Sequence, residues 1–197
     1  MKKTIIAAVG VLSILSSVPV VGAAELSVQS LSGRESAILP GNPFYFLKSW
    51  AGSMRGIFAD TKEQKLVIET NRVNKKASEI FQAEVASGRQ VSEQVRIDYA
   101  TLFNNWANSI ALLSADDQIN AKSIGYESKE AFFAYLLGRV ATHYRFADEK
   151  GIEINQELVN QALTRLEELM GTETFASEVE LIKSTHESPA VNELFAN

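Results

Sequence analysis

The chain of 197 residues contains no cysteine and only two histidines. The absence of cysteine excludes disulfide bonds, thiolate metal sites, haem attachment through a C-x-x-C-H motif and lipid attachment to an N-terminal cysteine. Stability must therefore come from packing, and any association with a cell envelope must be non-covalent.

An excess of basic residues is also missing. Nineteen Lys and Arg against 24 Asp and Glu give a formal net charge of −5. Without a free-standing basic patch, no nucleic acid is expected as a partner. The hydrophobic share of 46% and the charged share of 22% are ordinary for a packed globular protein, and they argue against disorder.

One apolar run is long enough to consider as a membrane-inserting segment, and it lies at residues 1–24. Two lysines near its start precede an apolar stretch and Pro19, and small residues end the run at Ala23 or Ala24. This order is typical of a signal peptide. We therefore predict cleavage after Ala23 or Ala24 and export to the periplasm or the extracellular space.

The alternative for this run is an uncleaved anchor, because Ile5 to Ala24 is about long enough to span a bilayer. Pro19 and the small residues at the cleavage site favour the signal peptide. Cleavage after Ala24 would leave 173 residues and, with Lys2 and Lys3 removed, a net charge of −7. No second run of spanning length follows, so we expect a soluble mature protein without a stable membrane span.

A sustained strand pattern is missing as well, since the one weak alternation lies at Leu26 and Val28. Apolar residues instead recur at steps of three and four, which is typical of amphipathic helices. Capping residues, glycines and prolines set their expected ends. The predicted helices are Phe44–Phe58, from Asp60 or Thr61 to Gly88, Ser92–Leu113, Ser114–Gly125, Ser128–Gly151, Asn155–Gly171, from Thr172 or Thr174 through Ile182, and a terminal turn from Ser188 through Phe195. We predict an all-α fold.

The two longest predicted helices are joined by the short segment Ser87–Val91, which folds them into an antiparallel hairpin. We predict a helical bundle built on this hairpin domain, residues 38–113. A C-terminal helical part, 114–197, packs on it, and a flexible, serine-rich arm, 25–37, precedes it. Solvated charges are expected on the outer face of the first long helix: Lys62, Lys65, Glu69, Arg72, Lys75, Lys76 and Glu79.

The string ILPGNPFYFLKSWAGSMRGIF, residues 38–58, carries a family resemblance. It is similar to the start of the bacterial domain of unknown function 5667, in which Leu-Pro-x-x-Pro-Phe-Tyr-x-x-Lys precedes a long charged helix. The matching positions are Leu39, Pro40, Pro43, Phe44, Tyr45 and Lys48. The resemblance covers about residues 38–113 and implies an exported protein with a helical hairpin. It implies no catalytic residue, because the family has no established activity.

This proline–aromatic segment is the candidate interaction surface. Its candidate residues are Phe44, Tyr45, Lys48 and Trp50. Together with Phe46 and Leu47, the three aromatic residues place apolar groups all round a short helix, which is more than one buried face requires. Part of that surface could bind a partner or the membrane interface. The alternative, which we favour, is that the helix lies across the open end of the hairpin and is covered on several sides.

Metal-site patterns are incomplete in this sequence. Neither His143 nor His186 has a glutamate three residues before it, as a ferritin-type site requires, and His186 lacks the second histidine of a zinc-protease motif. Residues 116–127 have the length of a calcium loop, but Ala121 occupies its glycine position. Two acids at a helix start explain that segment better. We predict no metal and no cofactor.

Catalytic patterns are equally incomplete. His143, beside Tyr144 and Arg145, could transfer a proton in a cleft, but we expect it to be hydrogen-bonded structure. No nucleophile elbow, phosphate-binding loop or dinucleotide fingerprint is present. We predict a non-catalytic interaction or structural module of the envelope or extracellular space, with an unidentified protein partner. The alternative is a small-molecule or lipid carrier or sensor with a pocket between the helices; an enzyme is the least favoured class.

Overall fold

The computed structural model describes residues 26–28, 30–31, 39–40 and 61–196. Within these residues it contains six α-helices, one short 3-10 helix and no strand, which confirms the all-α prediction. The helices are α2 (Lys62–Ser87), α3 (Glu93–Ala111), η2 (Ala121–Ile124, the 3-10 helix), α4 (Lys129–Glu149), α5 (Gln156–Met170), α6 (Thr172–His186) and α7 (Pro189–Leu194). The predicted leader and the predicted helix at 44–58 lie outside the described residues.

Local capping signals set the helix ends, as the sequence predicts. The Thr61 side chain accepts a hydrogen bond from the Gln64 N–H at 3.3 Å at the start of α2, and Ser128 accepts from the Ala131 N–H at 3.1 Å at the start of α4. These contacts satisfy N–H groups that the first helical turn leaves free. Gly88 ends α2 with a left-handed φ of 62°, a conformation that glycine adopts without strain.

The segment from Ser114 to Gly125 corrects the prediction of one short helix. A capping contact forms at its start, because the Ser114 N–H donates to the Asp117 carboxylate at 2.8 Å, but only η2 is helical. Asp117 also binds Lys62 Nζ at 2.6 Å, which attaches the turn to α2. The acid that was expected to start a helix therefore connects two elements.

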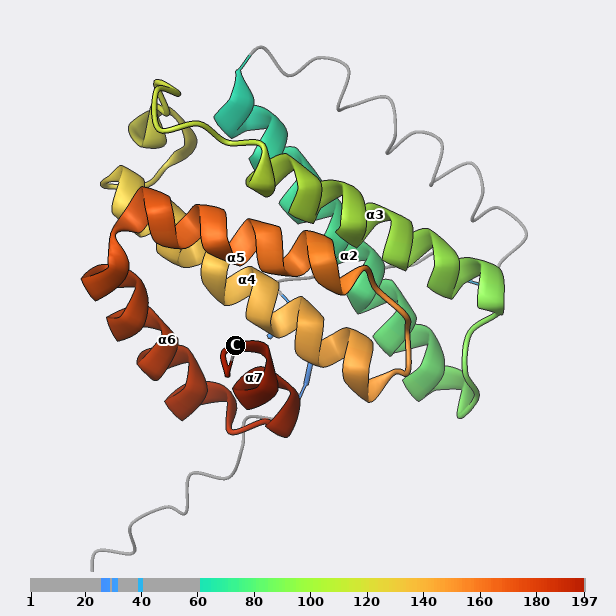
Figure 1. The fold of residues 1–197 in the computed structure, drawn as a ribbon. Helices are drawn as coiled ribbons and strands as arrows, with labels where there is room; N and C mark the ends of the chain where they lie inside the picture. The colour runs from blue at the N-terminus through green and yellow to red at the C-terminus, as the bar shows by residue number, and fades with distance from the viewer. Residues whose placement is uncertain (1–25, 29, 32–38, 41–60, 197) are drawn as a thin grey trace, which may run out of the picture.

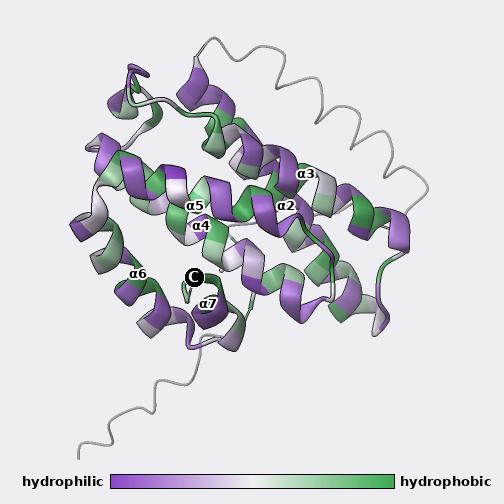
Figure 2. Ribbon diagram, in the orientation of Figure 1, coloured by the Kyte–Doolittle hydropathy of each residue, from purple (hydrophilic) through white to green (hydrophobic). Residues whose placement is uncertain are grey.

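The helices pack around α4 (Figure 1). The predicted antiparallel pair of α2 and α3 is present, yet α3 packs more extensively on α5 than on α2. The central helix α4 contacts α2, α3, α5, α6 and α7. Hydrophilic and hydrophobic stretches alternate along α3, α5 and α6 (Figure 2), as expected for helices with one buried side.

Aromatic side chains of α3 fill the space between α3 and α4. Tyr99, Phe103 and Trp106 are all fully buried. The ring centroids of Tyr99 and Phe146 lie 5.2 Å apart, and the Trp106 indole meets the His143 imidazole edge-on at 6.0 Å. Rings packed in this way stabilise the fold through the apolar area that they bury and through their edge-on geometry.

The predicted faces of α2 are partly wrong. Lys76 and Glu79, expected in solvent, are only 6% and 3% exposed, whereas the apolar Val85 is 70% exposed. Lys76 Nζ pairs with the Asp98 carboxylate of α3 at 3.2 Å. Because α2 packs against both α3 and α4, its buried arc is wider than a single apolar stripe.

The described residues of the arm predicted at 25–37 contact the bundle. Leu31 is fully buried within the core. Its N–H donates to the Ser27 carbonyl at 3.0 Å, which closes one turn of chain. The Ser30 carbonyl accepts a hydrogen bond from Arg139 Nη1 of α4 at 2.9 Å. The residues from 26 to 31 that the structure describes therefore belong to the packed fold.

Candidate functional site

A buried polar network lies at the middle of the bundle, around His143 of α4. His143 is fully buried; its Nδ1 lies 3.2 Å from the Tyr99 hydroxyl of α3, and its Nε2 lies 2.7 Å from Asn74 Oδ1 of α2. Because an amide oxygen can only accept, we assign the imidazole hydrogen to Nε2 and the accepting lone pair to Nδ1. The Tyr99 hydroxyl can then donate to Nδ1 or to the His143 carbonyl, which is also 3.2 Å away.

Arg139 extends this network to the N-terminal turn. Its Nε donates to Asn74 Oδ1 at 3.1 Å, and its Nη1 donates to the Ser30 carbonyl. We call Asn74, Tyr99, Arg139 and His143 the central cluster; it connects α2, α3, α4 and the docked turn. Burial, together with the Arg139 cation, holds the pKa of His143 well below its usual range. The imidazole is therefore neutral at pH 7.

The central cluster has the features of a structural connection. Burial raises the pKa of Tyr99 well above its usual value, so the phenol keeps its proton. The aromatic rings of Tyr99, Phe103 and Trp106 pack around the imidazole. This agrees with the expectation that His143 is hydrogen-bonded structure. Chemistry at this imidazole would require a path for solvent through a packed aromatic layer.

The other candidate positions from the sequence are separate from this cluster. His186 lies at the end of α6, and its carbonyl accepts from Arg145 Nη1 at 3.3 Å. In the acidic segment at 116–127, hydrogen bonding to Lys62 lowers the pKa of Asp117. Among the described residues, no group of three or more histidine or acidic side chains is placed to hold a metal ion.

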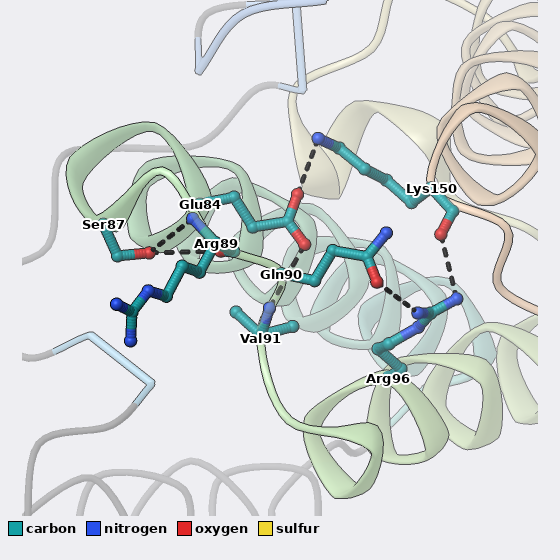
Figure 3. A network of polar contacts seen from close by, with 7 residues as sticks. All are labelled: Glu84, Ser87, Arg89, Gln90, Val91, Arg96 and Lys150. Atoms are coloured by element: carbon teal, nitrogen blue, oxygen red, sulfur yellow. Dashed lines mark hydrogen bonds and ion pairs between the residues drawn. The ribbon is translucent and has the colours of Figure 1, made fainter.

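A second polar network lies at the end of the bundle where α2 turns into α3 (Figure 3). The Glu84 carboxylate pairs with Lys150 Nζ at 2.7 Å and accepts from the Val91 N–H at 3.3 Å. Arg96 donates to the Lys150 carbonyl at 2.9 Å and to Gln90 Oε1 at 3.2 Å. We call these five residues the corner network. It attaches the α2–α3 turn to the end of α4.

In the turn between α2 and α3, the Arg89 backbone is hydrogen-bonded, whereas the Arg89 side chain has no such bond within the described part of the chain. The Ser87 hydroxyl accepts from the Arg89 N–H at 3.2 Å and donates to the Arg89 carbonyl at 3.1 Å. Figure 3 shows the Arg89 side chain extending away from the corner network. Its guanidinium makes no hydrogen bond or ion pair with any described residue. Arg89 is thus an exposed cation on a turn whose backbone is held by hydrogen bonds to Ser87.

A groove of about 430 Å³ runs beside this turn, and we call it the corner groove. Its polar lining comes from Ser87, Arg89, Gln90 and Ser92. Its apolar lining comes from Leu39, Pro40, Ala83, Ala86, Val91 and Val95. A second groove of about 410 Å³, between α3 and α5, is lined mainly by amide and charged side chains. Of these two grooves, the corner groove offers the larger apolar surface.

The predicted interaction surface stays a prediction, because Phe44, Tyr45, Lys48 and Trp50 lie outside the described residues. Leu39 and Pro40 come from the same proline–aromatic segment and line the corner groove.

The sequence pattern predicts residues 87–91 only as a joint between two helices and does not predict the groove beside them. An apolar Val91 two residues after an arginine, within a turn between two long helices, is the signal that was available. That signal is weak, because turns often carry single apolar residues.

No family model matches the chain, and no curated protein or solved structure matches it. The resemblance over about residues 38–113 therefore stays a prediction. None of the described helices combines the length and apolar character that crossing a membrane requires.

Proposed function

We propose that this chain is an exported helical module that acts by non-catalytic binding to a protein partner in the envelope or extracellular space. The observation that carries the proposal is the contrast between the filled aromatic centre around His143 and the open corner groove. A carrier of the kind considered as the alternative needs an enclosed pocket between helices. Both grooves described above lie at the surface instead.

Export is the part of the proposal that rests on the sequence alone. The twin lysines, the apolar stretch and the small residues at 23 and 24 support it. Mass spectrometry of the protein from its native host should find Ala24 or Glu25 at the mature N-terminus. Intact Met1 in most molecules would contradict export with cleavage and favour an anchor.

Affinity capture tests the binding function. The tagged mature chain is incubated with envelope extract and with culture medium from the native host, with the tag alone as control. Proteins, lipids and small molecules are analysed in the same eluate. We expect a protein enriched in stoichiometric amount over the control. Recovery of one lipid or small molecule without a protein would favour the carrier instead, and turnover of a captured compound would favour an enzyme.

A further inference from the structure

Resting on the proposed function, we infer that the corner groove binds an extended peptide segment of the partner protein, with apolar side chains next to a carboxylate. Three observations on the described residues lead to this partner: the apolar lining of the groove, the unpaired backbone groups of Gln90 and Ser92, and the unpaired positive charge at the rim.

The apolar lining sets the first requirement for the partner. Ala83 and Val95 are nearly buried, whereas Ala86 is exposed and Val91 is partly exposed. A volume of about 430 Å³ lies in the range of ligand-binding clefts, which is about 300–1,000 Å³. Burial of a partner's aliphatic side chains here would remove apolar surface from water on both sides.

The backbone of the turn sets the second requirement. Among the described residues, neither the N–H nor the carbonyl of Gln90 has a hydrogen-bond partner, and the same holds for the Ser92 N–H. Ser92 is extended, with φ −60° and ψ 153°. Free donors and acceptors on an extended, exposed stretch can pair with the backbone of an extended peptide. A lipid acyl chain offers no such groups, so the turn favours a peptide.

The charge at the rim sets the third requirement. The Arg89 guanidinium is exposed and unpaired within the described chain. The Ser92 side chain at the N-cap of α3 makes no capping hydrogen bond, so the positive end of that helix faces the groove without a side-chain acceptor. Glu93, in the first turn of α3, pairs with Arg96 at 3.8 Å. A carboxylate of the partner would therefore be favoured beside Arg89.

The corner network makes the groove a prebuilt site. Glu84 holds the Val91 backbone from one side, and Arg96 holds the Gln90 side chain from the other. Both anchors lead to Lys150 at the end of α4. A turn that is already held in place loses less conformational entropy when it binds.

Peptide selection on the full mature chain tests this inference. A random heptapeptide library displayed on phage is selected against the wild-type chain, and enriched peptides are measured on purified variants by fluorescence anisotropy. We expect apolar residues beside Asp or Glu in the enriched peptides. Ala86→Glu, which places bulk and negative charge in the groove, should weaken binding at least about tenfold. Ala176→Glu introduces the same change at an exposed site on α6 and should leave binding unchanged.

The Arg89 variants separate the charge from the apolar contact. Arg89→Ala should weaken binding about three- to tenfold, and Arg89→Lys should restore most of the loss. An equal loss with Ala176→Glu, or enrichment of peptides without an acid, would overturn the inference. So would Arg89-dependent binding of dioleoylphosphatidylglycerol vesicles in place of peptides. A captured partner that tolerates Ala86→Glu would overturn the groove assignment and leave the proposed function standing at another surface.

Discussion

The central cluster and the corner network connect the same three helices, α2, α3 and α4, but they differ in the polar groups that they leave unpaired. In the centre, Asn74 Nδ2 has no hydrogen-bond partner among the described residues, and the side chain is only 2% exposed. At the corner, Arg96 Nε is likewise buried without a hydrogen-bond partner among the described residues, but the Arg89 guanidinium and the Gln90 backbone are unpaired groups on exposed residues.

This difference separates the roles of the two regions. A buried group without a partner costs stability, and no other protein can reach it. An exposed group is hydrogen-bonded to water, and a partner can replace that water at little cost. The centre therefore contributes mainly to stability, and the corner is where we propose that a partner binds.

The largest expected effect lies in the centre, at Trp106. Trp106→Ala should lower the free energy of unfolding by about 3–5 kcal/mol, because it removes a fully buried indole from a packed aromatic layer. The indole N–H has no hydrogen-bond partner among the described residues, so the loss is one of packing. Urea unfolding followed by circular dichroism measures it. Leu112→Ala, at a residue that is 70% exposed, should cost less than about 0.5 kcal/mol. Equal losses in the two variants would contradict the role of the centre in stability.

The second effect is a pH dependence that originates in the centre. Because burial and Arg139 lower the pKa of His143 in the folded state, the unfolded chain binds a proton that the folded chain does not. Stability is therefore present above the usual histidine pKa of about 6.5 and is lost below it. The free energy of unfolding should fall by up to about 1.4 kcal/mol per pH unit.

Denaturant unfolding between pH 7.5 and 5.5 measures this slope. His143→Gln should remove most of the slope. The remainder should come from His186, whose pKa is also lowered by burial. Equal slopes for the wild-type chain and His143→Gln would mean that the imidazole does not titrate upon unfolding. The assignment of His143 as a buried, neutral imidazole would then be wrong.

The third effect concerns the ion pair of the corner network. Glu84→Gln removes the charge that binds Lys150, at side chains that are 13% and 24% exposed, and should cost about 1–2 kcal/mol. Glu180→Gln is the matched control, because its pair with Lys183 is at the surface, with Glu180 76% exposed. That control should change stability by less than about 0.5 kcal/mol. Similar small losses in both variants would show that the pair of Glu84 and Lys150 does not stabilise the turn.

The smallest effect concerns the turn that shapes the groove. Gly88→Ala should cost about 1 kcal/mol, since Gly88 has a φ of 62° that alanine adopts only with strain. Gly138→Ala, within α4 and with open space at the Cβ position, should instead stabilise by about 0.5–1 kcal/mol. Thermal unfolding of the two variants should shift in opposite directions. A stabilising Gly88→Ala would show that the turn does not need its left-handed residue.

Much of the fold could be predicted because its signals are local. The caps at Thr61 and Ser128 and the stop at Gly88 depend on hydrogen bonds or backbone angles within a few residues. The burial of Trp106 follows from its place in an apolar stripe. The turn at Ser114 differs because Asp117 has a partner far away in the sequence, Lys62, and no local pattern indicates such a partner.

The helical class, the ends of most helices and the absence of disulfide stabilisation follow from the order of residues along the chain. Tertiary packing placed α4 at the centre and buried His143 and Arg139 there in one polar cluster. It also decided that Leu31 enters the core and that Arg89 stands free beside a groove. The physical reason is that burial depends on how many neighbours surround a helix, whereas capping and periodicity depend only on the helix itself.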